Sequence, residues 1–217
     1  GGAEYLGDDY GIVFRGFDMA RTLAVREHPG LADGALNRPF DAARSGFLFS
    51  EGASGILVLE DLDHARSRGA PILCELAGVA ETCDGSSIMM IDAEGTEIER
   101  MLRGLVADAG LRTEDVDYVN AHGTGTKLND DIEATIIGRV FGGRPLVNST
   151  KSILGHTIGA SGALGAIVAA LSIRDGTTHP CVNLTDPIAD LNFVRGPVRQ
   201  AIRTAVAQSF AFGGHNA

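Results

Sequence analysis

The spacing of apolar residues along the chain predicts a series of helices. The clearest lies at residues 94–110, where an apolar stripe recurs every three or four positions and Gly110 ends the run. Its members are Ile98, Met101, Leu102, Leu105 and Val106. Similar spacing and stop signals predict helices over residues 16–27, 61–69, 129–143 and 159–176. We expect Asn129 or Asp130 to cap the helix at 129–143.

Short apolar runs bounded by turn-forming residues predict the strands. They cover residues 54–60, 71–84, 116–123, 145–150 and 203–214. Residues 28–46 are rich in Gly, Pro, Asp and Asn, which predicts a long irregular loop. Because most of the strands alternate with helices, the pattern indicates the α/β class.

The helix predicted from Gly159 to Arg174 has no polar face, since no charged residue occurs between Lys151 and Arg174. A helix that is apolar or small on every side is expected to be buried on every side. The outer helices of an ordinary α/β domain keep a polar face, so this one predicts a further layer beyond it. The remaining chain is too short to supply that layer.

Composition excludes several classes of function. The chain has 217 residues and a formal charge of −10, which argues against nucleic acid as a partner. We found no uninterrupted apolar run of 18 residues and no leader, so we expect no membrane partner. Three cysteines without C-x-x-C spacing argue against a disulfide framework or zinc site and favour a reducing cytoplasm. Because the chain opens on "GGAEY" and stops at "FGGHNA", we interpret it as part of something longer.

Two histidines are the candidates for chemistry. His122 in "NAHGTGT" and His156 in "KSILGHTIGASG" each follow a short apolar run, where parallel sheets usually bind ligands. Thr124 and Thr126 place hydroxyls beside His122, and Lys151 places a cation near His156. Each histidine could instead only satisfy loop backbone. Metal binding with Asp130, Asp131 and Glu133 is a further alternative, although these acids also suit a helix N-terminus.

The motifs "NAHGTGTKLND", "KSILGHTIGASGA" and "SFAFGGHNA", in this order, resemble the C-terminal half of β-ketoacyl synthases. "RPFDAARSGFLFSEGASGILVLE" is similar to a further stretch of that family, and "GGAE" resembles the strand that closes its N-terminal half. The resemblance implies an α/β, thiolase-like fold: a mixed five-stranded sheet with helices on both faces, part of a five-layer αβαβα architecture. Residues 1–50 would end the N-terminal half and connect it to a C-terminal ketosynthase domain at 51–217.

The resemblance also implies a reaction, the decarboxylative Claisen condensation of an acyl thioester with a malonyl thioester in fatty acid or polyketide synthesis. His122 and His156 would donate to the thioester oxygen, and Lys151 would order the pair. The Cys nucleophile would come from the missing N-terminal half. No cofactor or metal is implied.

Further roles follow from the same resemblance. Thr124 and Thr126 would hold the pantetheine arm, and Phe17 would line the acyl pocket. The N–H of Phe212 would form half of an oxyanion hole, and its ring would gate the pocket. Arg21 would contact an acyl carrier protein, although an ordinary solvated position fits it nearly as well. The implied partners are acyl carrier protein or acyl-CoA and a second subunit, as a homodimer or a ketosynthase heterodimer.

The chain departs from the family pattern at several positions. Gly165 stands where fatty-acid enzymes carry Glu, which favours a polyketide-like synthase. Lys127 replaces the usual Pro, and "CDGSSIMMID" replaces a His-bearing loop. Cys74, in an apolar run, is predicted to be a core residue. The alternatives are a non-catalytic scaffold that resembles a chain-length factor, or an acyltransferase of the same fold.

Overall fold

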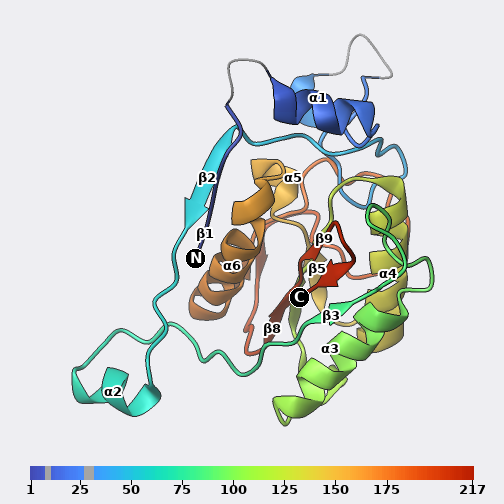
Figure 1. Cartoon of the computed structure of the whole chain (residues 1–217). Coiled ribbons are helices and arrows are strands. Elements are labelled where there is room, and N and C mark those ends of the chain that lie inside the picture. Colours follow the sequence, from blue (N-terminus) through green and yellow to red (C-terminus); the bar gives the residue numbers. More distant parts are fainter. Residues whose placement is uncertain (8–10, 27–31) are drawn as a thin grey trace.

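The computed structural model describes residues 1–7, 11–26 and 32–217 (Figure 1). The helices are α1 (Ile12–Met19), α2 (Leu62–Ser67), α3 (Thr96–Asp108), α4 (Lys127–Phe141), α5 (Lys151–Leu154) and α6 (Ser161–Asp175), with 3-10 turns at Asp33–Ala35, Thr113–Asp115 and Ile158–Ala160. The strands are β1 (Gly2–Tyr5), β2 (Gly52–Gly55), β3 (Thr82–Cys83), β4 (Tyr118–Asn120), β5 (Leu146–Asn148), β6 (Thr177–Thr178), β7 (Val198–Arg199), β8 (Ala205–Ala207), β9 (Phe210–Ala211) and β10 (His215–Asn216).

The centre of the fold is a mixed sheet. β5, β4 and β8 are parallel neighbours in that order, with Val147, Val119 and Val206 in register. β8 and β9 belong to one segment that is interrupted only at residues 208–209. β9 pairs antiparallel with β10, and β10 pairs antiparallel with β3. The two three-stranded sheets are therefore continuous through the β8–β9 segment, in the order β5, β4, β8/β9, β10 and β3, which agrees with the predicted five-stranded mixed arrangement.

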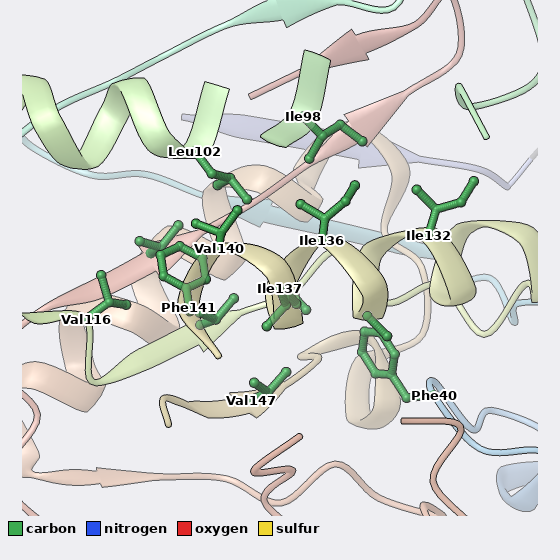
Figure 2. Close-up of a cluster of buried hydrophobic side chains, with 14 of the residues drawn as sticks. Phe40, Ile98, Leu102, Val116, Ile132, Ile136, Ile137, Val140, Phe141 and Val147 are labelled. Atoms are coloured by element: carbon green, nitrogen blue, oxygen red, sulfur yellow. The ribbon is translucent and has the colours of Figure 1, made fainter. Parts of the chain in front are cut away.

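Helices cover both faces of this sheet (Figure 1). On one face α3 packs against α4, because their apolar stripes meet over the strands (Figure 2). The shared core includes Ile98, Leu102, Ile136, Ile137 and Val147. On the other face α6 packs against β4 and β8. There a second, smaller core joins Tyr118, Leu146, Ala169, Val194 and Ile202. The ends of β4 and β5 therefore lie between two layers of helices.

α6 is buried on only part of its surface. The fully buried positions are Gly165, Ala169, Ala170 and Ser172, and the apolar residues between them are half-buried. The β1–β2 ribbon lies against another side of the helix. Among the described helices, the segment Ile158–Asp175 alone has the length and composition to cross a membrane. Because it packs on the sheet and on the ribbon, we interpret it as a core helix that this chain covers incompletely.

Two predicted strands are largely absent. Of residues 54–60 only the first two belong to β2, and of residues 71–84 only β3 is a strand. The apolar side chains between them are exposed, among them Ile56, Val58, Leu76 and Val79. No described strand pairs along 56–60 or 71–81, so these runs lack the cross-strand neighbours that stabilise a strand. The prediction that Cys74 is a core residue is wrong for the same reason, because this thiol is exposed.

Two helices have boundaries that differ from those predicted. α1 spans Ile12–Met19 rather than 16–27, because Leu23 leaves the helix to form a bridge with Phe47. Residue 27, the expected end, lies outside the described residues. α4 begins at Lys127 with Thr126 as its N-cap, so the prediction of a cap at Asn129 or Asp130 is wrong. The other predicted helices agree with α2, α3 and α6, and the described part of 28–46 contains only one 3-10 turn.

Candidate active site

His122 and His156 lie together at one edge of the sheet. β4 and β5 are parallel neighbours, so the loops at their carboxyl ends are adjacent. The first loop carries His122, and the second, which contains α5, carries Lys151 and His156. The two imidazole rings are nearly perpendicular, with centroids 5.6 Å apart. They form one constellation rather than two separate loop histidines.

Hydrogen bonds fix which nitrogen of each ring carries the proton. Lys151 Nζ lies 3.3 Å from His122 Nδ1 and donates to the His122 carbonyl at 2.7 Å. The backbone N–H of Ile158 donates to His156 Nδ1 at 3.0 Å. A ring nitrogen that accepts a hydrogen bond leaves the proton of a neutral imidazole on the other nitrogen. Both rings therefore present Nε2–H as a donor.

Burial keeps both rings neutral. The pKa of His122 lies well below its usual range, because burial disfavours the imidazolium and the positive charge of Lys151 adds to this. Burial, followed by the charge of Lys151, lowers the pKa of His156 to about 3. Burial also lowers the pKa of Lys151, and the carboxylates of Glu133 and Asp130 oppose that shift. At neutral pH the site therefore offers uncharged N–H donors beside a lysine.

Two buried acids of α4 hold the loop that carries His122. Glu133 accepts the backbone N–H of His122 at 2.6 Å and of Gly123 at 2.7 Å. Asp130 accepts the backbone N–H of Thr124 at 3.1 Å and both its oxygens accept that of Gly125. Sequence analysis considered these acids for helix capping or metal binding and missed this role. The signal was available, because acids three residues apart on one face of a helix can both meet the loop that precedes it.

Glycines bring the loops into contact. Gly123 has φ 41°, and a Cβ there would lie 2.6 Å from the Cβ of Ser149. Ser149 Oγ donates to the carbonyl of Gly123 at 2.8 Å, which ties the loop after β4 to the loop after β5. Gly125 has φ 81°, and a Cβ there would lie 2.8 Å from the carbonyl oxygen of Gly46. A side chain at either glycine would therefore separate the segments that form the site.

The two threonines follow His122 along this loop. Thr124 is buried and Thr126 is half-buried, and their Oγ1 atoms are 2.8 Å apart. Both hydroxyls retain capacity for a further hydrogen bond, since each has one donor and two acceptor positions. Arg44, which is buried, donates to the carbonyls of Thr126 and Lys127 and pairs with Asp131 at 2.6 Å. The loop is thus fixed at its outer end as well.

Aromatic rings line the side of the site next to His156. Phe47 lies 5.0 Å from the His156 ring, edge to face. The Phe17 ring contacts Phe49 at 4.9 Å and stacks on Phe212 at 6.0 Å. Phe17 and Phe212, which sequence analysis assigned to the pocket and its gate, therefore belong to one cluster. Sequence analysis did not single out Phe49, although its place two residues after Phe47 on an extended segment was a usable signal.

A side chain at position 165 would meet a polar network rather than Lys151. A Cβ at Gly165 would lie 2.9 Å from Asn120 Oδ1. Asn120 Nδ2 donates to the hydroxyl of Tyr118 at 2.8 Å and to Thr150 Oγ1 at 2.7 Å. The network reaches the loop that carries Lys151 because Thr150 precedes it. Sequence analysis missed this network, whose members are buried and have no charge to mark them.

None of the three cysteines has the environment of a nucleophile. Cys74 and Cys83 are exposed and Cys181 is buried. Burial raises the pKa of Cys181 to about 12, so its thiol stays protonated at neutral pH. A thiol in that state is a poor nucleophile. The constellation of His122, His156 and Lys151 therefore has no reactive thiol from this chain.

Comparisons with known proteins identify the family and the fold. The family model described as "Beta-ketoacyl synthase, C-terminal domain" matches residues 73–185. The chain is 41% identical to 3-oxoacyl-[acyl-carrier-protein] synthase 2 of Synechocystis over 94% of its own length and 50% of that protein. It is 45% identical to nodulation protein E of Rhizobium meliloti over 83% of its length and 46% of that protein. The chain thus spans about half the length of the curated relatives it matches.

Solved structures give the same result. A ketosynthase in complex with its acyl-carrier protein, from a type II polyketide synthase with bound hexaketide, superposes with a TM-score of 0.89 at 32% identity. The match covers 94% of this chain and 51% of that one. The ishigamide ketosynthase/chain length factor gives 0.86 at 36% identity, covering 100% of this chain and 51% of the other. With its thiolase-like fold, the chain belongs to the β-ketoacyl synthase family and carries that family's C-terminal domain.

Proposed function

We propose that this chain supplies the hydrogen-bond donors of a β-ketoacyl synthase active site. The observation that carries the proposal is the pair of neutral imidazoles, each with Nδ1 occupied and Nε2–H free to donate. Donors that are fixed in place before the reaction stabilise charge that develops in the transition state. Loss of carbon dioxide from a malonyl thioester places negative charge on the thioester oxygen. An oxygen bound between the two Nε2–H groups is stabilised as that charge grows.

The complete reaction needs a cysteine from the half that this chain lacks. Its thiolate attacks the acyl thioester and expels the carrier thiol, which leaves an acyl-Cys. The malonyl thioester then loses carbon dioxide, and the electron pair of the broken C–C bond forms an enolate. The enolate carbon attacks the acyl-Cys carbonyl, and the thiolate leaves and takes up a proton. The product is a β-ketoacyl thioester with two more carbons than the acyl group.

Lys151 orders this site in our proposal. Its Nζ contacts both Nδ1 and the carbonyl of His122, so it fixes the ring's tautomer and the loop together. Its charge also lowers the pKa of both histidines, which keeps them neutral donors. Thr124 and Thr126 bind amides of the pantetheine arm, and Phe17 with Phe212 borders the acyl group. The N–H of Phe212 completes an oxyanion hole for the acyl-Cys.

The second half of the synthase covers α6 and pairs with this chain. Half-buried apolar residues of α6, and the exposed apolar segments at 56–60 and 71–81, leave apolar surface that water solvates poorly. The proposed partners are this N-terminal half, a second subunit, and an acyl carrier protein or acyl-CoA. Residues 1–50 would connect the halves, with 51–217 as the C-terminal domain.

A non-catalytic scaffold of the same fold is the second candidate, because one similar structure is a ketosynthase/chain length factor. Catalysis is favoured because a scaffold has no need for two imidazoles with ordered tautomers beside a buried lysine. The discriminating residues are His122, His156 and Lys151, all of which this chain retains.

The experiment measures carbon dioxide release from a malonyl thioester by the two-half synthase. His122→Ala or His156→Ala should raise the barrier by about 2.7–4 kcal/mol, the usual effect of losing one oxyanion donor. Acylation of the cysteine, followed by mass spectrometry, should fall less in His122→Ala. His64→Ala, which removes an exposed histidine from α2, is the matched control. Small and equal losses in both steps would contradict the roles given to the histidines.

A further inference from the structure

The loop after β4 runs from the interior to the surface, and it ends on a lysine. Its side chains become steadily more exposed, from His122 and Thr124, both buried, through half-buried Thr126 to exposed Lys127. In the proposed function the histidines bind a thioester and the threonines bind amides. These groups occur in the same order along a phosphopantetheine arm, whose outer end is a phosphate. Lys127 occupies the corresponding outer position of the loop.

Lys127 is available for an anion. It forms no ion pair or side-chain hydrogen bond with any residue in the described ranges, whereas its neighbour Asp131 is paired with Arg44 at 2.6 Å. Arg44 also donates to the Lys127 carbonyl at 2.9 Å, so the backbone from which Lys127 projects is fixed. The chain has only two lysines, and the other is buried Lys151. The sole exposed lysine of an acidic protein therefore stands beside the proposed arm.

A second cation, Arg21, belongs to a segment that packs on the same stretch of backbone as the His122 loop. The Gly46 backbone packs between two segments: Phe47 N–H donates to the Thr22 carbonyl at 3.0 Å, and Gly125 contacts the Gly46 carbonyl. Arg21 precedes Thr22, and Lys127 follows Gly125 by two residues. Arg21 is exposed and forms no ion pair within the part of the chain that the structure describes. Arg21 and Lys127 therefore belong to the two backbone segments that the Gly46 segment joins.

We propose that Lys127, with Arg21 across the Gly46 segment, binds the phosphate of a phosphopantetheine arm at the mouth of the site. This inference rests on the proposed function, because it takes the direction of the arm from the histidines and threonines. A compact ammonium is a suitable partner for a phosphate dianion or diester. An acidic protein repels anionic substrates in general, and a local pair of cations offsets that repulsion where the arm enters.

Labelling of Lys127 tests the contact without any need for turnover. The two-half synthase is treated with an amine-reactive ester, and modification of Lys127 is followed by mass spectrometry. At a concentration that saturates the site, phosphopantetheine should slow this modification about fivefold, the factor expected for one exposed ion pair, and 1 M salt should remove the protection. Pantetheine, which lacks the phosphate, should give none. Equal protection by the two compounds would overturn the proposal.

Kinetic measurements provide a second test. The ratio of kcat/KM for malonyl-phosphopantetheine over malonyl-pantetheine should fall about fivefold in Lys127→Ala and recover in Lys127→Arg. Arg66→Ala, which removes an exposed cation on α2 far from α1 in Figure 1, should leave the ratio unchanged. An unchanged ratio in Lys127→Ala refutes the phosphate contact while condensation itself persists. Protection without any condensation would instead retain the contact and reject the proposed function.

Two further substrates distinguish the possible sources of the phosphate. A malonyl group on coenzyme A and one on a holo carrier protein both carry phosphate at the end of the pantetheine arm. Lys127→Ala should therefore weaken both. An apo carrier protein, which has no arm, should not protect Lys127. Protection by the apo carrier, or a loss confined to the carrier-borne substrate, would mean that Lys127 meets protein surface, and this would overturn the proposal.

Discussion

Acidification should destabilise the folded protein through His156, and the size of the effect follows from its burial. Burial lowers the pKa of this ring to about 3, against an ordinary value of 6.5. Between these values the unfolded histidine is protonated and the folded one is not. The unfolded state thus binds more protons, so the free energy of unfolding rises with pH across this window and falls as pH drops. At pH 5 the loss relative to neutral pH is about 2 kcal/mol.

Urea denaturation at pH 5 and pH 7.5, with wild type and His156→Asn, measures this linkage. Asparagine keeps a side-chain oxygen that can accept from the Ile158 N–H, but it does not titrate. The difference in unfolding free energy between the two proteins should change by about 2 kcal/mol between these pH values. Buried Asp130 and Glu133, whose pKa values burial raises, titrate in both proteins and cancel in the difference.

The matched control is His64→Asn, because His64 is exposed on α2 with 67% of its side chain accessible. The change of about 2 kcal/mol should be absent from this variant, because it arises from burial of an imidazole. If His156→Asn behaved like His64→Asn, the ring would already be protonated in the folded protein at pH 5. It could then not serve as the neutral donor on which the proposed mechanism depends.

Three further outcomes are expected. Glu133→Gln places an amide N–H against one of the backbone donors of the His122 loop, which should lower stability by about 1–3 kcal/mol in urea melts and reduce carbon dioxide release. Gly123→Ala should destabilise by more than about 1 kcal/mol, because φ is positive and Ser149 blocks the Cβ, whereas Gly104→Ala in α3, where the space is open, should stabilise by about 0.5–1 kcal/mol. In this chain without its N-terminal half, a thiol reagent should modify Cys74 quickly in the folded state and Cys181 only after unfolding, and mass spectrometry of the labelled peptides would show the reverse if these burial assignments were wrong.

The local sequence pattern was sufficient to predict the elements whose apolar residues are buried against other parts of this chain. The stripe of Ile98, Met101, Leu102 and Val106 predicted α3, and the structure buries all four. The central strands β4 and β5, whose residues are all buried, were predicted for similar reasons. The apolar runs at 56–60 and 71–81 failed as strands because a strand is stabilised by its neighbours, which a single segment cannot specify. Leu23 lies outside α1 and bridges to Phe47, a contact distant in sequence that local spacing does not reveal.

By itself, the sequence determined the α/β class, the two histidine-bearing loops and the resemblance to β-ketoacyl synthases. Short-range spacing and motif order encode these features, so no tertiary contact was needed to find them. The tertiary structure decided that His122 and His156 face each other at 5.6 Å, that their Nδ1 atoms are occupied, and that α4 acids hold the loop. These facts depend on which strands are neighbours and on burial, which shifts pKa values. Both are properties of the packed chain and are absent from any local run of residues.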